Sequence, residues 1–187
     1  MDERHAKGVT GQADGGPVPG FRRAEARGME FRRETADDLG FLSALYASTR
    51  GEELAPLAWS EAQKAHFLDM QFRAQHSHYA RHFPNALRLI IEHLGKPVGR
   101  LCLEFRREEH RIIDVALVPM ARGRGFGEAL LRDVMDGAAS NGVAVGIHVE
   151  KANPAMRLYR RLGFAVRQDK GVYDLLDWRP PQVNTAS

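Results

Sequence analysis

The turn from Arg122 to Gly127 holds the residues of this sequence best suited to bind an anion. It reads RGRGFG, three glycines separated by an arginine and a phenylalanine and preceded by a second arginine. Glycine permits backbone conformations in which several N–H groups share one space, and a helix start adds unpaired donors and a favourable dipole. The arginines keep their charge at any physiological pH. The turn therefore predicts a site for a phosphate or pyrophosphate group.

Two well-known phosphate-binding loops do not fit the spacing of these glycines. A dinucleotide fingerprint, G-x-G-x-x-G/A, would need glycine or alanine at position 128 or 130, which are Glu128 and Leu130. A P-loop would need Gly-Lys-Ser/Thr, which does not follow the turn. What remains is the pattern Arg122-x-x-Gly125-x-Gly127, for which an ordinary strand-to-helix turn is the alternative interpretation.

The segments on either side of this turn must position it. An apolar run from Ile112 to Val118 predicts a buried strand, which Pro119 ends because proline cannot donate to a continuing ladder. Amphipathic periodicity predicts a helix over Gly125–Ala139, ended by Asn141-Gly142. A second buried strand is expected over Val143–Glu150. The turn therefore joins a strand to a helix.

The whole chain predicts a mixed α/β domain without internal repeats. Gly51 and Pro56 predict an irregular segment from Thr49 to Trp59. The expected order is strand, two helices, three antiparallel strands, helix, strand, helix and two strands. Besides those named above, the elements are predicted over Glu30–Arg33, Thr35–Ser48, Glu61–Phe83, Ala86–His93, Val98–Phe105, Asn153–Leu162, Phe164–Arg167 and Val172–Trp178.

Length and composition predict one domain between two tails. Residues 1–28 are rich in glycine and poor in apolar residues, so we expect a disordered tail, a domain over 29–179 and a short tail over 180–187. The single cysteine, Cys102, excludes an internal disulfide framework and fits a reducing cytoplasm. No apolar run of about 18 residues is present, so we expect no membrane partner.

The formal charge of +3 favours a polyanionic partner. No basic stripe interleaved with aromatic residues is evident, so we expect a polyanionic cofactor and no nucleic acid. Three histidines, His76, His78 and His82, suggest a metal site, but no acidic residue or cysteine joins them in the same turn. We therefore predict surface histidines and no metal.

A second motif lies one strand after the glycine turn. Residues 153–164 read NPAMRLYRRLGF, in which Asn153 and Pro154 suit the start of a helix. In this order the two motifs resemble the signatures of the GNAT (GCN5-related N-acetyltransferase) superfamily, Gln/Arg-x-x-Gly-x-Gly/Ala and Asn-Pro-Ala-x-x-Leu-Tyr-x-x-x-Gly-Phe. The resemblance covers residues 31–178. It implies the GNAT fold, an α/β fold with a mixed, mostly antiparallel central sheet, splayed between the fourth and fifth strands and flanked by helices.

The resemblance also implies which residues bind acetyl-CoA, the expected co-substrate. Backbone groups of Ala116, Leu117 and Val118 would pair with the pantetheine arm. Asn153 would hydrogen-bond the same arm, with helix capping as its alternative or additional role. N–H groups of the glycine turn would surround the pyrophosphate. The cofactor-binding residues expected there are Arg122, Gly123, Arg124, Gly125, Gly127 and Glu128.

Attack of an amine on a thioester needs a neutral amine, donors for the oxyanion and a proton for the leaving thiolate. Tyr159 suits the last role, since a phenol with a pKa of about 10 can serve a thiolate whose acid has a pKa of about 8.5. A core tyrosine is its alternative role. Backbone N–H groups near Leu117 and Val118 would serve the oxyanion. The candidates for the base are Asp114, Glu150 and His148, beside a chain of water molecules.

Asp114 interrupts an apolar strand, where a carboxylate is costly to bury unless it is paired or wet. Strand alternation places it on the face of Ala116 and Val118, unless a bulge intervenes. Either it pairs with a neighbour such as Arg111 or Arg100, or it lines the acceptor cleft and receives a cationic amine. The resemblance implies the second role, since an acidic residue at this strand position is frequent in GNAT enzymes with amine acceptors.

The function implied is transfer of an acetyl group from acetyl-CoA to a primary amine by direct attack on the thioester. The acceptor would be a small-molecule or peptide amine, and the prediction leaves a homodimer open. A catalytically silent acyl-CoA-binding sensor or scaffold of the same fold is the alternative.

Overall fold

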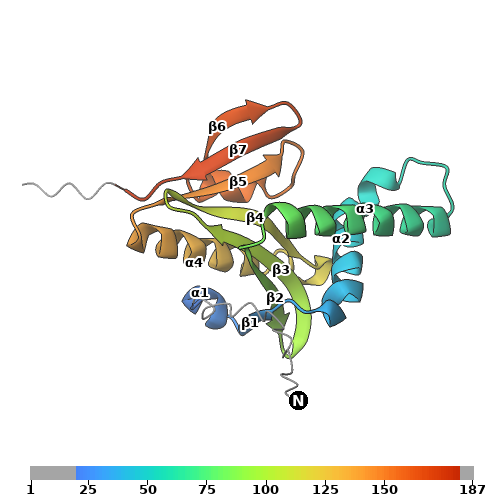
Figure 1. The fold of residues 1–187 in the computed structure, drawn as a ribbon, viewed down its shortest axis with the longest axis horizontal. Helices are drawn as coiled ribbons and strands as arrows, with labels where there is room; N and C mark the ends of the chain where they lie inside the picture. The colour runs from blue at the N-terminus through green and yellow to red at the C-terminus, as the bar shows by residue number, and fades with distance from the viewer. Residues whose placement is uncertain (1–19, 182–187) are drawn as a thin grey trace, which may run out of the picture.

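The computed structural model describes residues 20–181, and the first and last segments of the chain lie outside the described residues. Five helices and seven strands follow one another in the predicted order, with one additional helix at the start (Figure 1). The helices are α1 (Arg22–Glu25), α2 (Leu39–Leu54), α3 (Glu61–His82), α4 (Phe126–Ser140) and α5 (Met156–Arg161), with 3₁₀ turns η1 (Ala36–Asp38) and η2 (Pro119–Ala121). The strands are β1 (Met29–Arg33), β2 (Leu87–His93), β3 (Lys96–Phe105), β4 (Glu109–Leu117), β5 (Ala144–Glu150), β6 (Ala165–Lys170) and β7 (Tyr173–Trp178).

The strands form one sheet in the order β1-β2-β3-β4-β5-β7-β6, which is antiparallel except between β4 and β5. The parallel pairing of these two strands runs only from Glu109 opposite Ala144 to Ile112 opposite Ile147. Beyond that point β4 continues to Leu117 and β5 to Glu150 without pairing with each other, while β3 and β7 pair with their outer edges. The expected splay between the fourth and fifth strands is thus confirmed. It leaves the edges of both strands available to a ligand.

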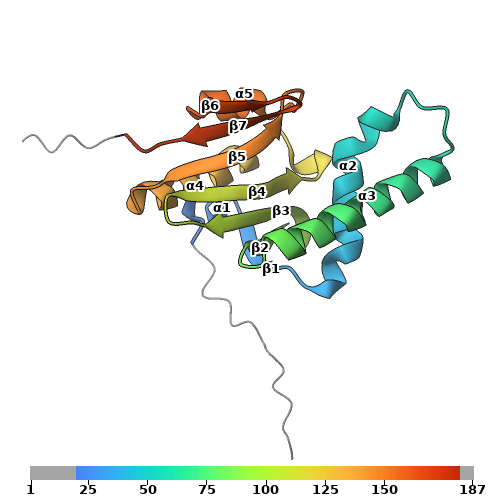
Figure 2. The same ribbon diagram turned by 45° about the horizontal axis from the view of Figure 1, so that its top comes forward.

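Helices cover both faces of the sheet (Figures 1 and 2). On one face, Leu89 and Ile91 of β2 belong to the same buried cluster as Leu130 of α4. On the other, Ile90 packs in a second cluster with two residues of α2 and α3, Leu42 and Phe72. This division follows from the strand, in which successive side chains point to opposite faces. Helices α1 and α4 therefore lie on one side and α2 and α3 on the other.

The prediction of a loose tail over residues 1–28 is wrong for residues 20–28. They form α1 and the turn into β1, and Phe21 is only 2% exposed. Asp133 of α4 accepts hydrogen bonds from the backbone N–H groups of Arg23 (3.0 Å) and Ala24 (2.9 Å), which satisfies two donors at the start of α1. These contacts join residues more than a hundred positions apart, so local composition gave no sign of them. Residues 1–19 and 182–187 lie outside the described residues.

Helix α2 also runs further than predicted, since it continues through Gly51 to Leu54. Glycine inside a helix costs about 1 kcal/mol relative to alanine. Burial of Leu54 and an ion pair between Arg50 and Glu53 offset this cost. The extension places the side chain of Arg50 close to β5, where it matters for the site. Within residues 20–181, no helix is long and apolar enough to cross a membrane.

Candidate active site

The glycine turn, for which the sequence predicts an anion loop, lies at the start of α4. Gly123 and Gly125 adopt φ angles of 70° and 78°, which side-chain-bearing residues rarely take. None of the six consecutive N–H groups from residue 123 to residue 128 has a hydrogen-bond partner within residues 20–181. Four of these donors are the orphans that any helix start leaves, and the loop adds two more. The arrangement suits a pyrophosphate.

The arginines of the loop have different surroundings. Arg122 donates from Nε to the carbonyl of Leu117 (2.8 Å) and from Nη2 to Ser48 of α2 (3.4 Å), so its side chain links the loop to the opposite face of the sheet. The guanidinium of Arg124 lies 5.0 Å from the centre of the Phe126 ring. A third arginine, Arg27, donates to the carbonyl of Arg124 (3.4 Å). Sequence reasoning missed Arg27, because the fold of residues 20–28 brings it there.

The free edge of β4 offers fewer backbone groups than predicted. The N–H of Val118 donates to the carbonyl of Val98 (2.8 Å), and the Val118 carbonyl accepts from Ala121. Because backbone groups alternate between the two edges of a strand, Ala116 also faces β3, whereas Leu117 faces the side of β5. Val118 is therefore not a free donor for an oxyanion. Leu117 is the residue of the predicted three whose N–H faces the splay.

Asn153 keeps its side-chain nitrogen available for the cofactor, and Glu128 keeps its backbone N–H. The side-chain oxygen of Asn153 accepts the N–H of Ala155 (2.8 Å), which helps to start α5 and leaves the amide nitrogen without a partner in the described part of the chain. The Glu128 carboxylate accepts hydrogen bonds from Arg161 (2.7 Å) and Arg132 (3.0 Å). These bonds hold the pKa of the Glu128 carboxyl below its usual range. Its charge is thereby balanced beside the anion loop.

Tyr159 lies in the buried core, only 4% exposed, with its ring 5.6 Å from the ring of Phe164. Its hydroxyl has no hydrogen-bond partner within residues 20–181. Burial raises the pKa of Tyr159 strongly, and the charge of Asp114 adds to the rise. The phenol therefore keeps its proton over the whole physiological range. Tyr159 therefore packs in the core, as its alternative role expects.

Asp114 lies on the face of the sheet that α2 and α3 cover. The bulge that sequence reasoning left open occurs one residue earlier, since Cys102 pairs with Asp114 and Leu103 with Ile112. The Asp114 side chain is 24% exposed, and its oxygen lies 3.5 Å from a guanidinium nitrogen of buried Arg100. Burial raises the pKa of Asp114, and Arg100 opposes the rise. Of the two predicted partners, the structure pairs it with Arg100.

Arg100 is shared between two carboxylates. It also approaches Glu34 at 3.4 Å, and Glu34 in turn lies 3.7 Å from the His76 ring nitrogen. Both distances from Arg100 exceed the roughly 2.7–2.9 Å of a strong charge-assisted hydrogen bond. Asp114 is therefore only loosely held. The sequence gave no sign of Glu34, because a separation of 66 residues connects it to Arg100.

Glu150 is held more tightly than Asp114. Its carboxylate is 2.7 Å from Arg50 of α2 and accepts the hydroxyl of Tyr173 at 3.0 Å. In the other predicted candidate, His148, ring atom Nδ1 lies 3.1 Å from Nη1 of Arg111, which can donate a hydrogen bond to it. Burial lowers the pKa of His148, and the charge of Arg111 lowers it further. Both contacts of the Glu150 carboxylate are short, whereas the contact of Asp114 with Arg100 is long. Asp114 is therefore the less tightly held of the two carboxylates.

Cys102 is fully buried beside Asp114, and burial raises its thiol pKa to about 11. Such a thiol stays protonated, which fits a residue that packs in the core and not a nucleophile. Within residues 20–181 no group of three or more His, Cys, Asp and Glu side chains could hold a metal ion.

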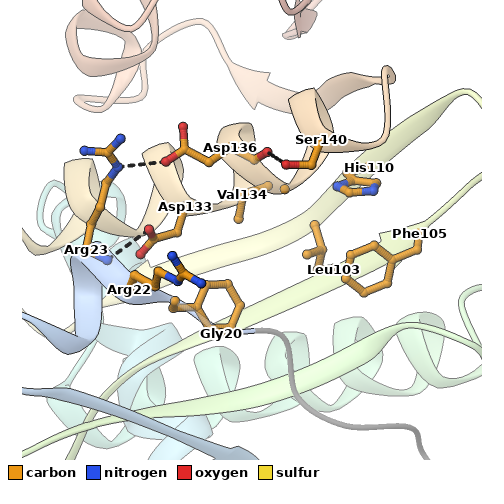
Figure 3. Close-up of a pocket in the computed structure, with 12 residues that line it drawn as sticks. Gly20, Arg22, Arg23, Leu103, Phe105, His110, Asp133, Val134, Asp136 and Ser140 are labelled. Atoms are coloured by element: carbon orange, nitrogen blue, oxygen red, sulfur yellow. Dashed lines mark hydrogen bonds and ion pairs between the residues drawn. The ribbon is translucent and has the colours of Figure 1, made fainter.

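A cavity of about 550 Å³ lies away from both signature motifs, between α1, the second half of α4 and the paired ends of β3 and β4 (Figure 3). It is lined by Phe21, Leu103, Phe105 and His110, among others. Neither the anion loop nor Tyr159 contributes to it. We therefore place the chemistry at the splay, where the donors and charged groups converge, and not in this cavity.

The protein thus has an α/β fold whose sheet opens between two parallel strands, with a glycine turn rich in unpaired N–H groups after the first of them. The sequence profile of the acetyltransferase (GNAT) family matches residues 51–164, more than half of the chain. The chain belongs to the GNAT family.

Solved structures share this fold at low sequence identity. The PaiA N-acetyltransferase of Thermoplasma acidophilum, solved with coenzyme A, is 16% identical with a TM-score of 0.62, over 81% of this chain and 99% of that one. Ard1 from Thermoplasma volcanium is 17% identical with a TM-score of 0.53, over 83% and 99% of the two chains. An acetyltransferase from Thermus thermophilus is 16% identical with a TM-score of 0.58, over 81% and 97%. A search of curated proteins gave no significant match.

Proposed function

We propose that this protein transfers an acetyl group from acetyl-CoA to a primary amine by direct attack of the amine on the thioester. The observation that carries the proposal is the run of six N–H groups, residues 123–128, that have no partner in the described part of the chain and follow the strand at which the sheet opens. Membership of the GNAT family and a similar fold solved with coenzyme A support the same co-substrate. In this proposal the loop takes the pyrophosphate, and the pantetheine arm lies along the free edge of β4.

The chain's own groups suit each step of the reaction. The N–H of Leu117 faces the splay and would donate to the oxyanion that forms as the amine attacks. The Tyr159 hydroxyl would then donate to the sulfur as the carbon–sulfur bond breaks. Burial raises the pKa of Tyr159, which makes its hydroxyl a weaker acid. The hydroxyl would therefore first stabilise the leaving thiolate by a hydrogen bond, before any proton is transferred.

The charges around the site favour an acceptor amine that binds in its protonated, positively charged form. Asp114 and Glu150 are partly exposed carboxylates on the parts of β4 and β5 that do not pair with each other. Two arginines, Arg50 and Arg100, are each already paired with two carboxylates, so the negative charge is in excess. We infer that Asp114 receives the ammonium group and takes its proton, since its pKa is raised and its contact with Arg100 is long.

The test is a reaction with acetyl-CoA and a pool of amines that includes monoamines, diamines, amino acids and short peptides. Mass spectrometry of the products identifies any acetylated amine, and a thiol reagent follows the release of CoA. The proposal expects at least one product, and it expects slower formation with Tyr159→Phe. Tight CoA binding in calorimetry without a product from any amine would instead favour a silent acyl-CoA-binding protein.

A further inference from the structure

Helix α1 lies beside α4 and precedes the residues that match the family profile. It is fixed to α4 by the hydrogen bonds of Asp133 to its first turn and by an ion pair of 2.9 Å between Arg23 and Asp136 (Figure 3). Buried Phe21 adds an apolar anchor, with its ring centre 4.3 Å from that of Phe31. The turn that follows α1 is therefore held in place.

This turn brings the guanidinium of Arg27 against the middle of the loop. Arg27 Nη1 donates to the carbonyl of Arg124 at 3.4 Å, which is a long and weak hydrogen bond. A Cβ atom placed on Gly125 would lie 3.0 Å from Arg27 Nη1 and 3.3 Å from its Cζ. The Arg27 side chain is otherwise exposed to solvent. A cation therefore lies next to the glycine at the N-cap of α4, and its existing hydrogen bond is easily replaced.

The other cations of the loop are less free to bind a phosphate. Arg122 is tied to Leu117 and to Ser48, and Arg124 lies against the ring of Phe126. Coenzyme A brings a pyrophosphate and a further phosphate on its ribose, and arginine matches phosphate oxygens with paired N–H donors. Without a free side-chain cation, only the partial positive charges of the backbone N–H groups would balance this anion.

We propose that Arg27 binds a phosphate group of CoA, so that α1 supplies a cofactor ligand from outside the family's shared core. The proposal rests on the proposed function, in which the loop at residues 123–128 holds the pyrophosphate. Binding would replace the long Arg27–Arg124 hydrogen bond with one or two charge-assisted bonds to phosphate oxygens. Arg27 acts in binding and touches no reacting atom of the thioester.

The experiment compares Arg27→Ala with Arg22→Ala by calorimetric titration with CoA, dephospho-CoA and pantetheine. Arg22 is a matched control, because it is an exposed arginine of α1 whose loss changes the net charge equally. The Arg27→Ala protein should bind CoA roughly 10- to 100-fold more weakly, the usual effect of losing a charge-assisted bond, while Arg22→Ala binds as the wild type. Pantetheine, which has no phosphate, should bind both variants equally. Arg27→Lys should restore part of the affinity.

Dephospho-CoA distinguishes the two phosphate sources. A loss that persists with dephospho-CoA assigns Arg27 to the pyrophosphate, and a loss seen only with CoA assigns it to the ribose phosphate. Equal CoA affinity of the Arg27→Ala and Arg22→Ala proteins would overturn the inference, and so would an equal loss of pantetheine binding, which would mark Arg27 as a support for the loop. Wild-type protein that does not bind CoA at all would refute the proposed function itself.

Discussion

Replacing Gly125 with aspartate tests the anion loop directly, because it changes the conformation and the charge at one position. Gly125 has a φ of 78°, and a side chain in this left-handed region costs about 1–2 kcal/mol. Within residues 20–181, the three atoms nearest to a Cβ at this position all belong to the flexible end of Arg27, the first at 3.0 Å, and this end can move. Gly125→Ala should therefore lower the melting temperature by a few degrees, on the scale of about 2–4 °C per kcal/mol for a chain of this size.

The aspartate adds a charge effect to this strain. A carboxylate about 5 Å from a phosphate, at an effective dielectric constant of about 20, is repelled by about 3 kcal/mol. This energy corresponds to a loss of CoA affinity of roughly a hundredfold. The new carboxylate would also pair with Arg27 and withdraw that cation from the phosphates. The loss should therefore be clearly larger for Gly125→Asp than for Gly125→Ala.

Calorimetric titration with CoA and with pantetheine measures both effects, and thermal unfolding checks that the variants fold. The reasoning expects Gly125→Ala and Gly125→Asp to bind pantetheine alike and to differ in CoA affinity. If a folded Gly125→Asp protein binds CoA as tightly as Gly125→Ala does, the loop at residues 123–128 is not the phosphate site. The unpaired N–H groups would then need another explanation.

Three further predictions concern other parts of the molecule. Tyr159→Phe should retain CoA affinity and lower kcat by roughly 10- to 10⁴-fold, and rapid-quench kinetics showing unchanged chemistry would leave Tyr159 as packing alone. Asp114→Asn should raise KM for the acceptor. It should also remove the increase in kcat/KM that the wild type shows as pH rises past the raised pKa of Asp114. An equal loss of CoA binding and stability would instead mark Asp114 as structural. Asp38 is held by two hydrogen bonds from Arg32, which lower its pKa from 3.8 to about 2, so the carboxylate stabilises the fold above about pH 4 and this contribution is lost as pH falls towards 2. Urea unfolding at a series of pH values should therefore show that the free energy of unfolding of the wild type falls by about 2 kcal/mol more across this window than that of Asp38→Asn. The same dependence on pH in both proteins would contradict the prediction.

The sequence alone determined the parts of this protein that depend on short-range pattern. The glycine spacing of Arg122–Gly127, the proline that ends β4 and the motif that starts at Asn153 each favour a particular local backbone, because proline fixes its φ angle and glycine adopts left-handed angles that other residues rarely take. Apolar periodicity then identified the strands and helices around them. From these features followed the order of the elements and the prediction of an anion loop. The two motifs together carried the resemblance to the family, and that resemblance implied the splay between β4 and β5.

Only the tertiary structure decided which charged side chains surround the site. Arg27 reaches Gly125 because Asp133 and a buried Phe21 hold α1 against α4, and residue composition had predicted a tail there. Arg50 meets Glu150 because α2 continues past Gly51. The same holds for Val118, whose N–H is used by β3. Contacts of this kind depend on packing between distant segments, and no spacing within one segment encodes them, since the free energy that fixes them comes from burial and pairing across the fold.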